Sequence, residues 1–143
     1  MNFFKNTYRL INKYNQKTKT AKRYGTEDLL YSAEVHMIEI IGSYENITTT
    51  KLAEVLGITK GAVSQVTRKL LEKNLIRKQL SGEKVNETPI TLTDKGRVVY
   101  SYHQTMHKKM FDKIDLILSD LPEEGKVAVN RILQVIEDSL DEL

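Results

Sequence analysis

Two of the chain's three histidines stand four residues apart in the stretch His103-Gln104-Thr105-Met106-His107. On a helix this spacing places both imidazole rings on one face, one turn apart. Paired imidazoles bind transition metals or act as acids and bases. A zinc protease helix reads His-Glu-x-x-His, in which the glutamate is the general base. Gln104 stands where that glutamate would be, so the stretch excludes this hydrolase chemistry and leaves metal binding open.

The remaining composition argues against catalysis and against a membrane. There is no cysteine, which excludes disulfides, thiolate nucleophiles and cysteine-rich zinc sites. No nucleophile–base pattern is present either, so we predict that the protein is not an enzyme and requires no cofactor. No apolar run approaches the roughly 18 residues of a membrane span. The N-terminal stretch is broken by Lys5, Arg9 and Lys13, so we expect a cytoplasmic protein without a signal peptide.

Charge is distributed unevenly along the 143 residues, although the formal net charge is only +3. Residues 1–28 and 60–84 are strongly basic, whereas acids predominate from Asp112 onward. Such asymmetry indicates one surface that faces a polyanion and another that is kept away from it, although solvated helix faces produce the same pattern.

The middle of the chain, TTKLAEVLGITKGAVSQVTRKLLEKNLI, predicts a helix-turn-helix that begins at Thr49. Ala53 falls where the two helices approach closely, and Gly57 falls at the tight turn, where positive φ is favoured. Val63 and Val66 fall where the second helix must bury apolar groups. Four further apolar residues complete this interface, namely Leu52, Leu56, Ile58 and Leu70.

The second helix of this unit is capped by Thr59 and presents a polar face suited to reading DNA bases. Glutamine pairs with adenine, arginine pairs with guanine, and the helix N-terminus offers N–H donors to a phosphate. The residues that we expect to contact bases are Thr59, Lys60, Gly61, Ser64, Gln65 and Arg68. Those that we expect to contact phosphates are Thr48, Thr50, Lys69 and Lys78, and Lys84 in the wing is a further DNA-binding candidate.

The flanking segments predict more helix and a short hairpin. A helix is expected over about residues 3–20, and another from Ser32 as its cap, with Val35, Ile38 and Ile41 on one side. Strands are expected over residues 75–80 and 88–92, and Thr93 caps a further helix with Asp94 in its first turn. The fold class is therefore mainly α with a small β wing, a winged helix-turn-helix.

Together, LAEVLGITKGAVSQVTRKLLEKNLIRK and ITLTDKG resemble the MarR family of transcription regulators over almost the whole chain. The resemblance implies a homodimeric, ligand-responsive repressor that binds a near-palindromic operator, with recognition helices in successive major grooves. It also implies helices over about residues 3–20, 93–118 and 122–141 that interlock in the dimer. The expected organisation is a dimerisation helix and connection (1–30), a DNA-binding lobe (31–96) and C-terminal dimerisation helices (97–143).

Two apolar stripes support the dimer independently, because one small winged lobe cannot cover both. They comprise Val99, Tyr102, Met106, Met110 and Ile114, and then Val127, Ile132, Val135, Ile136 and Leu140.

The wing departs from the family pattern. Members commonly carry an arginine there that enters the minor groove, but Val85 and Asn86 stand at the matching positions. Lys84 is the nearest replacement, and it lacks the planar fork of arginine. We therefore expect weaker wing contacts.

The resemblance offers three interpretations of the histidines. His36, His103 and His107 coincide with ligands in the zinc-responsive branch, but Thr18 stands near the position of that branch's carboxylate, and Glu27, Asp28 and Glu34 do not align cleanly. A branch that regulates fatty-acid synthesis has similar histidines that need not hold metal, and buried structural imidazoles are the third interpretation.

A small organic effector is the family's usual ligand, with Tyr8, Tyr14, Tyr31, Tyr100 and Tyr102 as candidate lining residues. A ligand or interaction protein of the same fold that never touches DNA is the remaining alternative.

Overall fold

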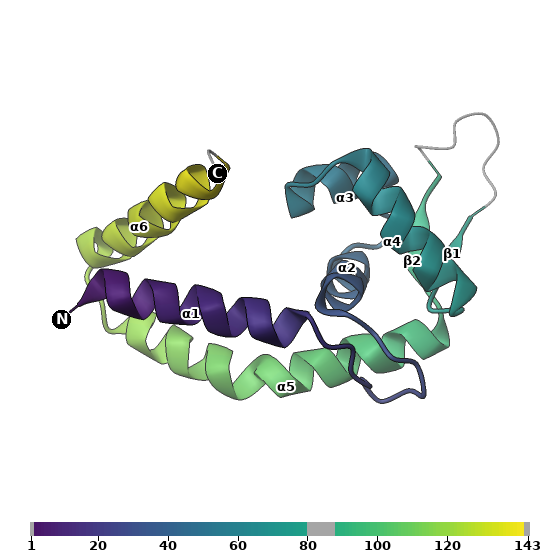
Figure 1. The fold of residues 1–143 in the computed structure, drawn as a ribbon, viewed down its shortest axis with the longest axis horizontal. Coiled ribbons are helices and arrows are strands. Elements are labelled where there is room, and N and C mark those ends of the chain that lie inside the picture. The colour runs from purple at the N-terminus through teal and green to yellow at the C-terminus, as the bar shows by residue number, and fades with distance from the viewer. Residues whose placement is uncertain (1, 80–87, 142–143) are drawn as a thin grey trace. The chain divides into compact units, whose positions relative to one another are not determined.

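The computed structural model describes residues 2–79 and 88–141. It divides into two compact units, Met1–Gln104 and Thr105–Leu143. The elements in chain order are α1 (Phe3–Thr18), α2 (Ser32–Ser43), α3 (Thr49–Leu56), α4 (Lys60–Glu72), β1 (Ile76–Lys78), β2 (Ile90–Leu92), α5 (Asp94–Ser119) and α6 (Glu123–Asp141), labelled in Figure 1. The mainly α composition with a small sheet confirms the predicted fold class.

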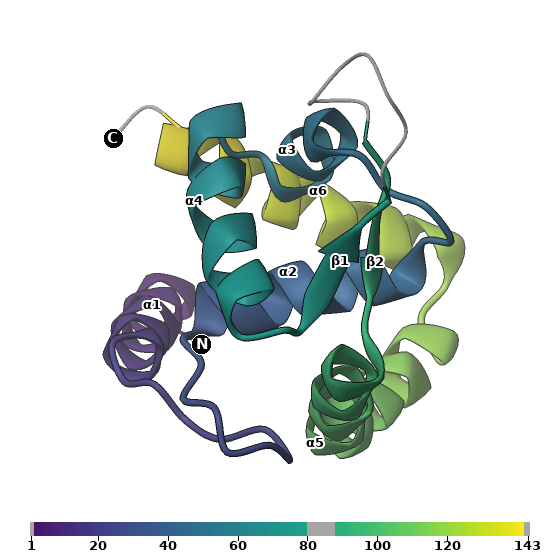
Figure 2. The same cartoon turned by 90° about the vertical axis from the view of Figure 1, so that its right-hand side faces the viewer.

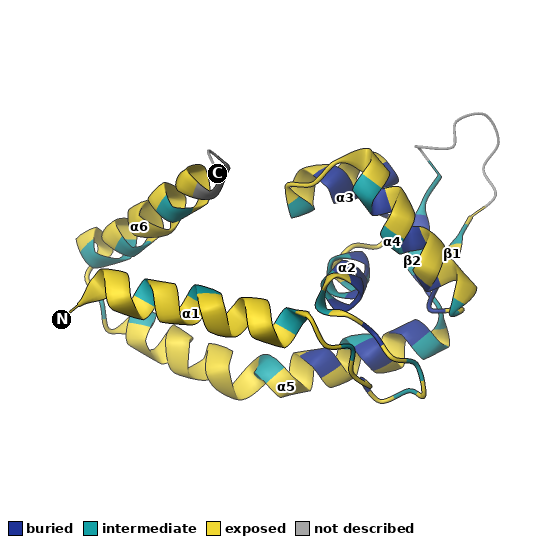
Figure 3. Cartoon of the chain, in the orientation of Figure 1, coloured by how far each residue is buried: buried dark blue, intermediate teal, exposed yellow. Residues whose placement is uncertain are grey.

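The core of the first unit is built around α2. Its residues Val35, Ile38 and Ile41 are at most 1% exposed, as the spacing predicts. Helices α3 and α4 and strand β2 pack against α2, an arrangement visible in Figure 2. Figure 3 shows the buried positions concentrated on α2, on the sheet and on the first turns of α5. Burial of this apolar surface is the main force that holds the lobe together.

The start of α2 differs from the prediction in a way that matters for function. Ser32 is the first helical residue rather than the cap, and Tyr31 occupies the N-cap position. The carboxylate of Glu34 accepts a hydrogen bond from the Tyr31 backbone N–H at 2.9 Å. Glu34, in the first turn, therefore satisfies the backbone N–H of the N-cap residue itself, as the glutamate of a capping box does.

The wing is an antiparallel pair in which Ile76 lies opposite Leu92 and Lys78 lies opposite Ile90. Each strand has three residues, fewer than predicted, and Ile47 adds an isolated bridge to Ile90. The expected contacts of Lys84, and the arginine positions filled by Val85 and Asn86, lie outside the described residues.

Helix α5 begins where the sequence predicts. The hydroxyl of Thr93 accepts a hydrogen bond from the Gly96 N–H at 3.0 Å and donates one to the Asn74 carbonyl at 2.7 Å. Thr93 therefore caps α5 and also ties it to the residues that follow α4.

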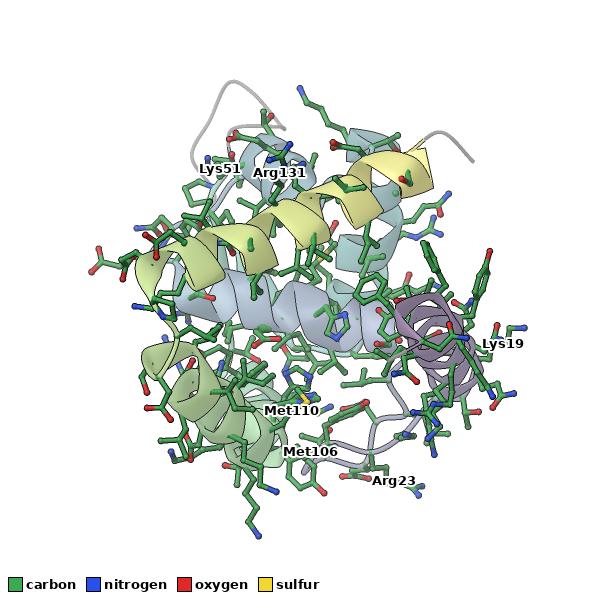
Figure 4. The ribbon with its side chains drawn as sticks, turned by 90° about the vertical axis from the view of Figure 1, so that its left-hand side faces the viewer. Lys19, Arg23, Lys51, Met106, Met110 and Arg131 are labelled. Atoms are coloured by element: carbon green, nitrogen blue, oxygen red, sulfur yellow. The ribbon has the colours of Figure 1, made fainter. Side chains whose placement is uncertain are left out.

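The second unit contains the rest of α5 and α6, and its apolar residues are largely exposed. Met106 and Met110, labelled in Figure 4, are 50% and 47% exposed, and Ile132 is 44% exposed. In the first unit α1 likewise contains no buried residue. No described helix is both long and apolar enough to cross a membrane.

Candidate nucleic-acid interface

The turn between α3 and α4 has the geometry of a helix-turn-helix. Gly57 adopts φ +64°, the left-handed conformation that its position predicts, and the Ile58 N–H donates to the Ala53 carbonyl at 3.1 Å. Ala53 and Val63 are buried at 8% and 0% exposure, so the helices meet where the sequence places small and branched residues. Ile58 is the exception, since it is 40% exposed and does not join the interface between the two helices.

Helix α4 has one buried and one exposed face. Val63, Thr67 and Leu70 are buried against the rest of the lobe. Thr59 caps the helix, because its hydroxyl accepts from the Ala62 N–H at 3.1 Å. The exposed face carries every residue that was expected to read bases: Thr59, Lys60, Gly61, Ser64, Gln65 and Arg68.

Arg68 has a neighbour that the base-reading hypothesis did not consider. Its Nε lies 4.0 Å from a carboxylate oxygen of Glu72, one turn further along α4. Both side chains are about 70% exposed, at 73% and 69%, so water weakens the attraction. Arg68 is therefore free to exchange this partner for a base or a phosphate.

The expected phosphate contacts lie around the same surface with different degrees of exposure. Thr48 caps α3 by accepting from the Lys51 N–H at 3.2 Å, which leaves its hydroxyl proton for an external acceptor. Thr50 and Lys69 are exposed, and Lys78 on β1 is half-buried. The capping role of Thr48 adds a structural reason for this residue, beside any contact with DNA.

A hollow of about 380 Å³ lies between α1, the start of α2 and the helix-turn-helix. Tyr14 and Tyr31 line it, together with His36 and the apolar side chains of Met37 and Ile58. Two of the five tyrosines proposed for a ligand pocket thus meet in one hollow. The other three do not line it: Tyr8 is exposed on α1, Tyr100 packs against the core near Gly42, and Tyr102 makes an edge contact with Tyr24.

The histidines are divided between the two units. The rings of His36 and His103 lie 5.7 Å apart between centroids, and Nδ1 of the buried His103 lies 3.2 Å from Oε2 of Glu39. His107 belongs to the second unit, where its ring contacts Phe111.

The residues present do not make a complete metal site. Among the described residues, no group of three or more His, Asp or Glu side chains is arranged to hold a metal ion. Two of the candidate carboxylates are already bound by lysines, Asp28 by Lys95 at 2.8 Å and Glu34 by Lys73 at 2.6 Å. These ion pairs join residues far apart in sequence, and the sequence offered no signal for them beyond the charges themselves.

A helix-turn-helix followed by an antiparallel two-stranded sheet defines a winged helix-turn-helix protein. Residues 30–83 match the model of the MarR family. The transcriptional regulators PchR and YhjH of Bacillus subtilis (strain 168) are 26% and 34% identical over 75% and 78% of this chain. The chain spans 63% of the length of each.

Solved structures of low sequence identity share the fold over nearly the whole chain. The zinc-responsive MarR family member ZitR of Lactococcus lactis has a TM-score of 0.66 at 20% identity, with 97% of each chain covered. FabT of Streptococcus pneumoniae, in complex with DNA, has a TM-score of 0.67 at 23% identity, with 99% of each chain covered. The chain therefore carries a MarR family domain over residues 30–83, as the sequence resemblance implies, and the relatives PchR and YhjH are named transcriptional regulators.

Proposed function

We propose that the protein is a DNA-binding transcription regulator that represses its targets by occupying a near-palindromic operator as a homodimer. The observation that carries this proposal is the polar face of α4, which is exposed along its length while the opposite face is fully buried. Ser64, Gln65 and Arg68 lie together on this exposed face. Their side chains are those that discriminate bases in the major groove.

The dimer is supported by the apolar residues that this chain leaves in water. Phe4, Leu10, Leu116 and Val127 are each more than 60% exposed, at 76%, 66%, 65% and 64%. Exposed apolar side chains on α1 of the first unit, and on α5 and α6 of the second unit, indicate surfaces that a second copy covers. Two copies related by a two-fold axis present two α4 helices, which accounts for an operator with two similar halves.

An organic effector is supported by the hollow beside α4. Tyr14 and Tyr31 offer aromatic faces and hydroxyl groups, and His36 offers a polar nitrogen. This lining suits a small aromatic or acidic molecule. An occupant changes operator affinity only to the extent that it binds one arrangement of α4 more tightly than another.

The zinc alternative is carried by the pair His36 and His103 and by the zinc response of ZitR. Asp28 and Glu34, two of the candidate carboxylates, are already paired with lysines, and the part of the chain that the structure describes shows no group of three or more possible ligands. We therefore propose an organic effector in preference to a metal ion. No step of the proposed mechanism depends on zinc.

Selection from a random-sequence duplex library with the wild-type protein tests the proposal. The selected duplex is then titrated by fluorescence anisotropy at several salt concentrations. We expect a sequence preference, and a slope of log affinity against log salt that becomes less steep by roughly 0.9 for each phosphate contact removed.

Two double variants that remove the same charge from different helices test whether the loss of affinity is specific to α4. The double variant Lys60→Gln/Arg68→Gln removes two positive charges from α4, and Lys126→Gln/Arg131→Gln removes two from α6. We expect only the first to lose affinity for the selected duplex. If the wild type shows no sequence preference and no salt dependence, the protein is instead a ligand-binding or interaction protein of the same fold.

A further inference from the structure

The C-terminal end of α4 is held by an ion pair that reaches across the core. Lys73, the residue that follows α4, sends its side chain to α2. Its Nζ donates to Oε1 of Glu34 at 2.6 Å and to the Leu29 carbonyl at 3.0 Å. The recognition helix is therefore attached to the first turn of α2 by a charged, directional contact and not only by apolar packing.

Glu34 is unusual among the carboxylates that the structure describes because it is almost completely buried. The residue is 3% exposed, and each of its two oxygens has a partner, Lys73 Nζ on one and the Tyr31 N–H on the other. A buried charge is tolerated only when it is paired and hydrogen-bonded in this way. Movement of Lys73 away from α2 would leave that charge without its cation, so the pair resists such movement.

A second lysine, Lys95 on α5, also binds Lys73, at its backbone carbonyl. Lys95, in the first turn of α5, donates to the backbone carbonyl of Lys73 at 3.0 Å and to Oδ2 of Asp28 at 2.8 Å. The backbone of Lys73 is thus fixed by α5 while its side chain is fixed by α2. Both anchors act on the end of α4 opposite to Thr59, where the base-reading face begins.

We propose that Glu34 and Lys73 are positioning residues that set the angle at which α4 enters the major groove. A helix anchored at its C-terminal end has a defined direction at its N-terminal end, and side chains such as Gln65 and Arg68 require that direction to meet base edges. Nonspecific contacts with phosphates tolerate a range of angles, because they depend mainly on charge. Loss of the ion pair should therefore reduce discrimination more than total affinity.

For Glu34→Gln, the proposal predicts weaker binding to the specific duplex, whereas the loss of a negative charge alone predicts stronger binding. The substitution removes a negative charge from a protein that binds a polyanion, so charge alone predicts tighter binding to any duplex. Glu34 is too deeply buried to touch DNA itself. Weaker binding to a specific duplex can then arise only through the placement of other residues.

The experiment measures two affinities for each variant by anisotropy, one for the duplex selected by the wild type and one for a scrambled duplex of equal length. The control is Glu54→Gln, which removes the same charge from an exposed ion pair with Lys51 on α3 (2.8 Å, with side chains 68% and 45% exposed). All measurements are made well below the melting temperature of the least stable variant. Glu34→Asp and Lys73→Arg keep the charges and serve if the neutral variants fold poorly.

For Glu34→Gln we expect about a tenfold loss on the selected duplex and less than a twofold change on the scrambled one. Lys73→Met should show the same selective loss, and the double variant Glu34→Gln/Lys73→Met should be no worse than the more damaging single variant. Charge-preserving variants should retain most of the preference.

The proposal is overturned if Glu34→Gln behaves like Glu54→Gln on both duplexes. It is also overturned if the losses at Glu34 and Lys73 add independently, because Lys73 would then act as a phosphate contact and not as the partner of Glu34. A wild-type protein that selects no duplex at all would overturn the proposed regulatory function, and the positioning role with it.

Discussion

Gly96 lies so close to the carbonyl oxygen of Leu75 that a Cβ atom at position 96 would collide with that oxygen. The contact brings the first turn of α5 onto the backbone that connects α4 to the wing. Leu75 also accepts a hydrogen bond from the Thr93 N–H at 3.1 Å. The sequence LTDKG thus has a physical basis here: threonine caps the helix, lysine binds the end of α4, and only glycine leaves room for the approach.

Gly96→Ala should therefore destabilise the lobe severely. The atom that the new methyl group meets belongs to the backbone, which cannot rotate away as a flexible side chain can. We expect a loss of about 3 kcal/mol in the free energy of unfolding, at the upper end of the usual cost of overpacking. Urea unfolding followed by circular dichroism measures this change.

Gly61→Ala is the matched control. A Cβ at Gly61 would have only the Thr59 hydroxyl within 4 Å, at 3.8 Å, and the residue lies inside a helix. Alanine should raise stability there by up to about 1 kcal/mol. Equal losses in the two variants would show that close packing at Gly96 is not the cause.

Arg68 and Glu72 make a second prediction, about affinity rather than stability. Arg68→Ala should weaken binding to the selected duplex by about 1–3 kcal/mol if the guanidinium reads a base. Glu72→Gln should strengthen binding, because it removes a negative charge close to the duplex and releases Arg68 from its partner at 4.0 Å.

The double variant Arg68→Ala/Glu72→Gln separates these two effects, with anisotropy as the measurement. If release of Arg68 matters, Glu72→Gln should gain less affinity when Arg68 is absent. An unchanged affinity in Arg68→Ala would remove this residue from the base-reading set.

Local patterns made the helix-turn-helix predictable from sequence. Ala53, Gly57 and Val63 lie within one short segment, and each meets a steric demand that the neighbouring residues impose. Thr59 and Thr93 likewise cap the helices that begin directly after them, as predicted. Such features depend on contacts between residues a few positions apart, which a single sequence displays.

The contacts that position the recognition helix could not be predicted in the same way. Glu34 and Lys73 are 39 residues apart, and the chain offers many other pairs of opposite charge. Tyr31 at the N-cap of α2 was missed because the sequence offered Ser32 as the typical capping side chain, whereas in the structure the Tyr31 N–H is satisfied by Glu34. The tertiary fold decided between partners that were equivalent in the sequence.

The pH dependence of stability should carry a contribution from Asp28. The hydrogen bond from Lys95 holds the pKa of the Asp28 carboxyl below its ordinary value, and the charge of Lys95 adds to the effect. A depressed pKa contributes stability that is present above the ordinary carboxyl range, about pH 4, and is lost as the pH falls through the folded-state pKa.

Asp28→Asn should cost about 1 kcal/mol at pH 7, since the pair is only partly buried, and should flatten the loss of stability below about pH 4. Urea unfolding at a series of pH values measures both effects. Asp120→Asn, which removes a carboxyl from an exposed position between α5 and α6, is the comparison variant. A profile for Asp28→Asn that is parallel to the wild type would show that Lys95 does not stabilise the ionised form.

The homodimer is tested most directly on α5. Met110 is 47% exposed in the single chain, so Met110→Glu should leave the chain folded while it places a charge within the proposed interface. We expect dimerisation to weaken by roughly tenfold or more in sedimentation velocity, and binding to the selected duplex to fall with it. Lys109→Glu places the same residue at the adjacent, exposed position as a control. Unchanged dimerisation in Met110→Glu would exclude this part of α5 from the interface.

The last prediction concerns zinc and the paired histidines. Nδ1 of His103 is already close to Glu39, and Asp28 and Glu34 are bound to lysines, so recruitment of these groups to a metal would break existing contacts. We therefore expect one equivalent of zinc, added to chelator-treated protein, to change the affinity for the selected duplex by less than about threefold, or roughly 0.6 kcal/mol of coupling.

The same titration on His103→Gln, which keeps a polar side chain in the buried site, provides the control. A tenfold zinc effect in the wild type that disappears in His103→Gln would contradict the expectation and assign these histidines to a metal sensor. A similar zinc effect in both proteins would place the ion elsewhere and leave His103 as a structural residue between α2 and α5.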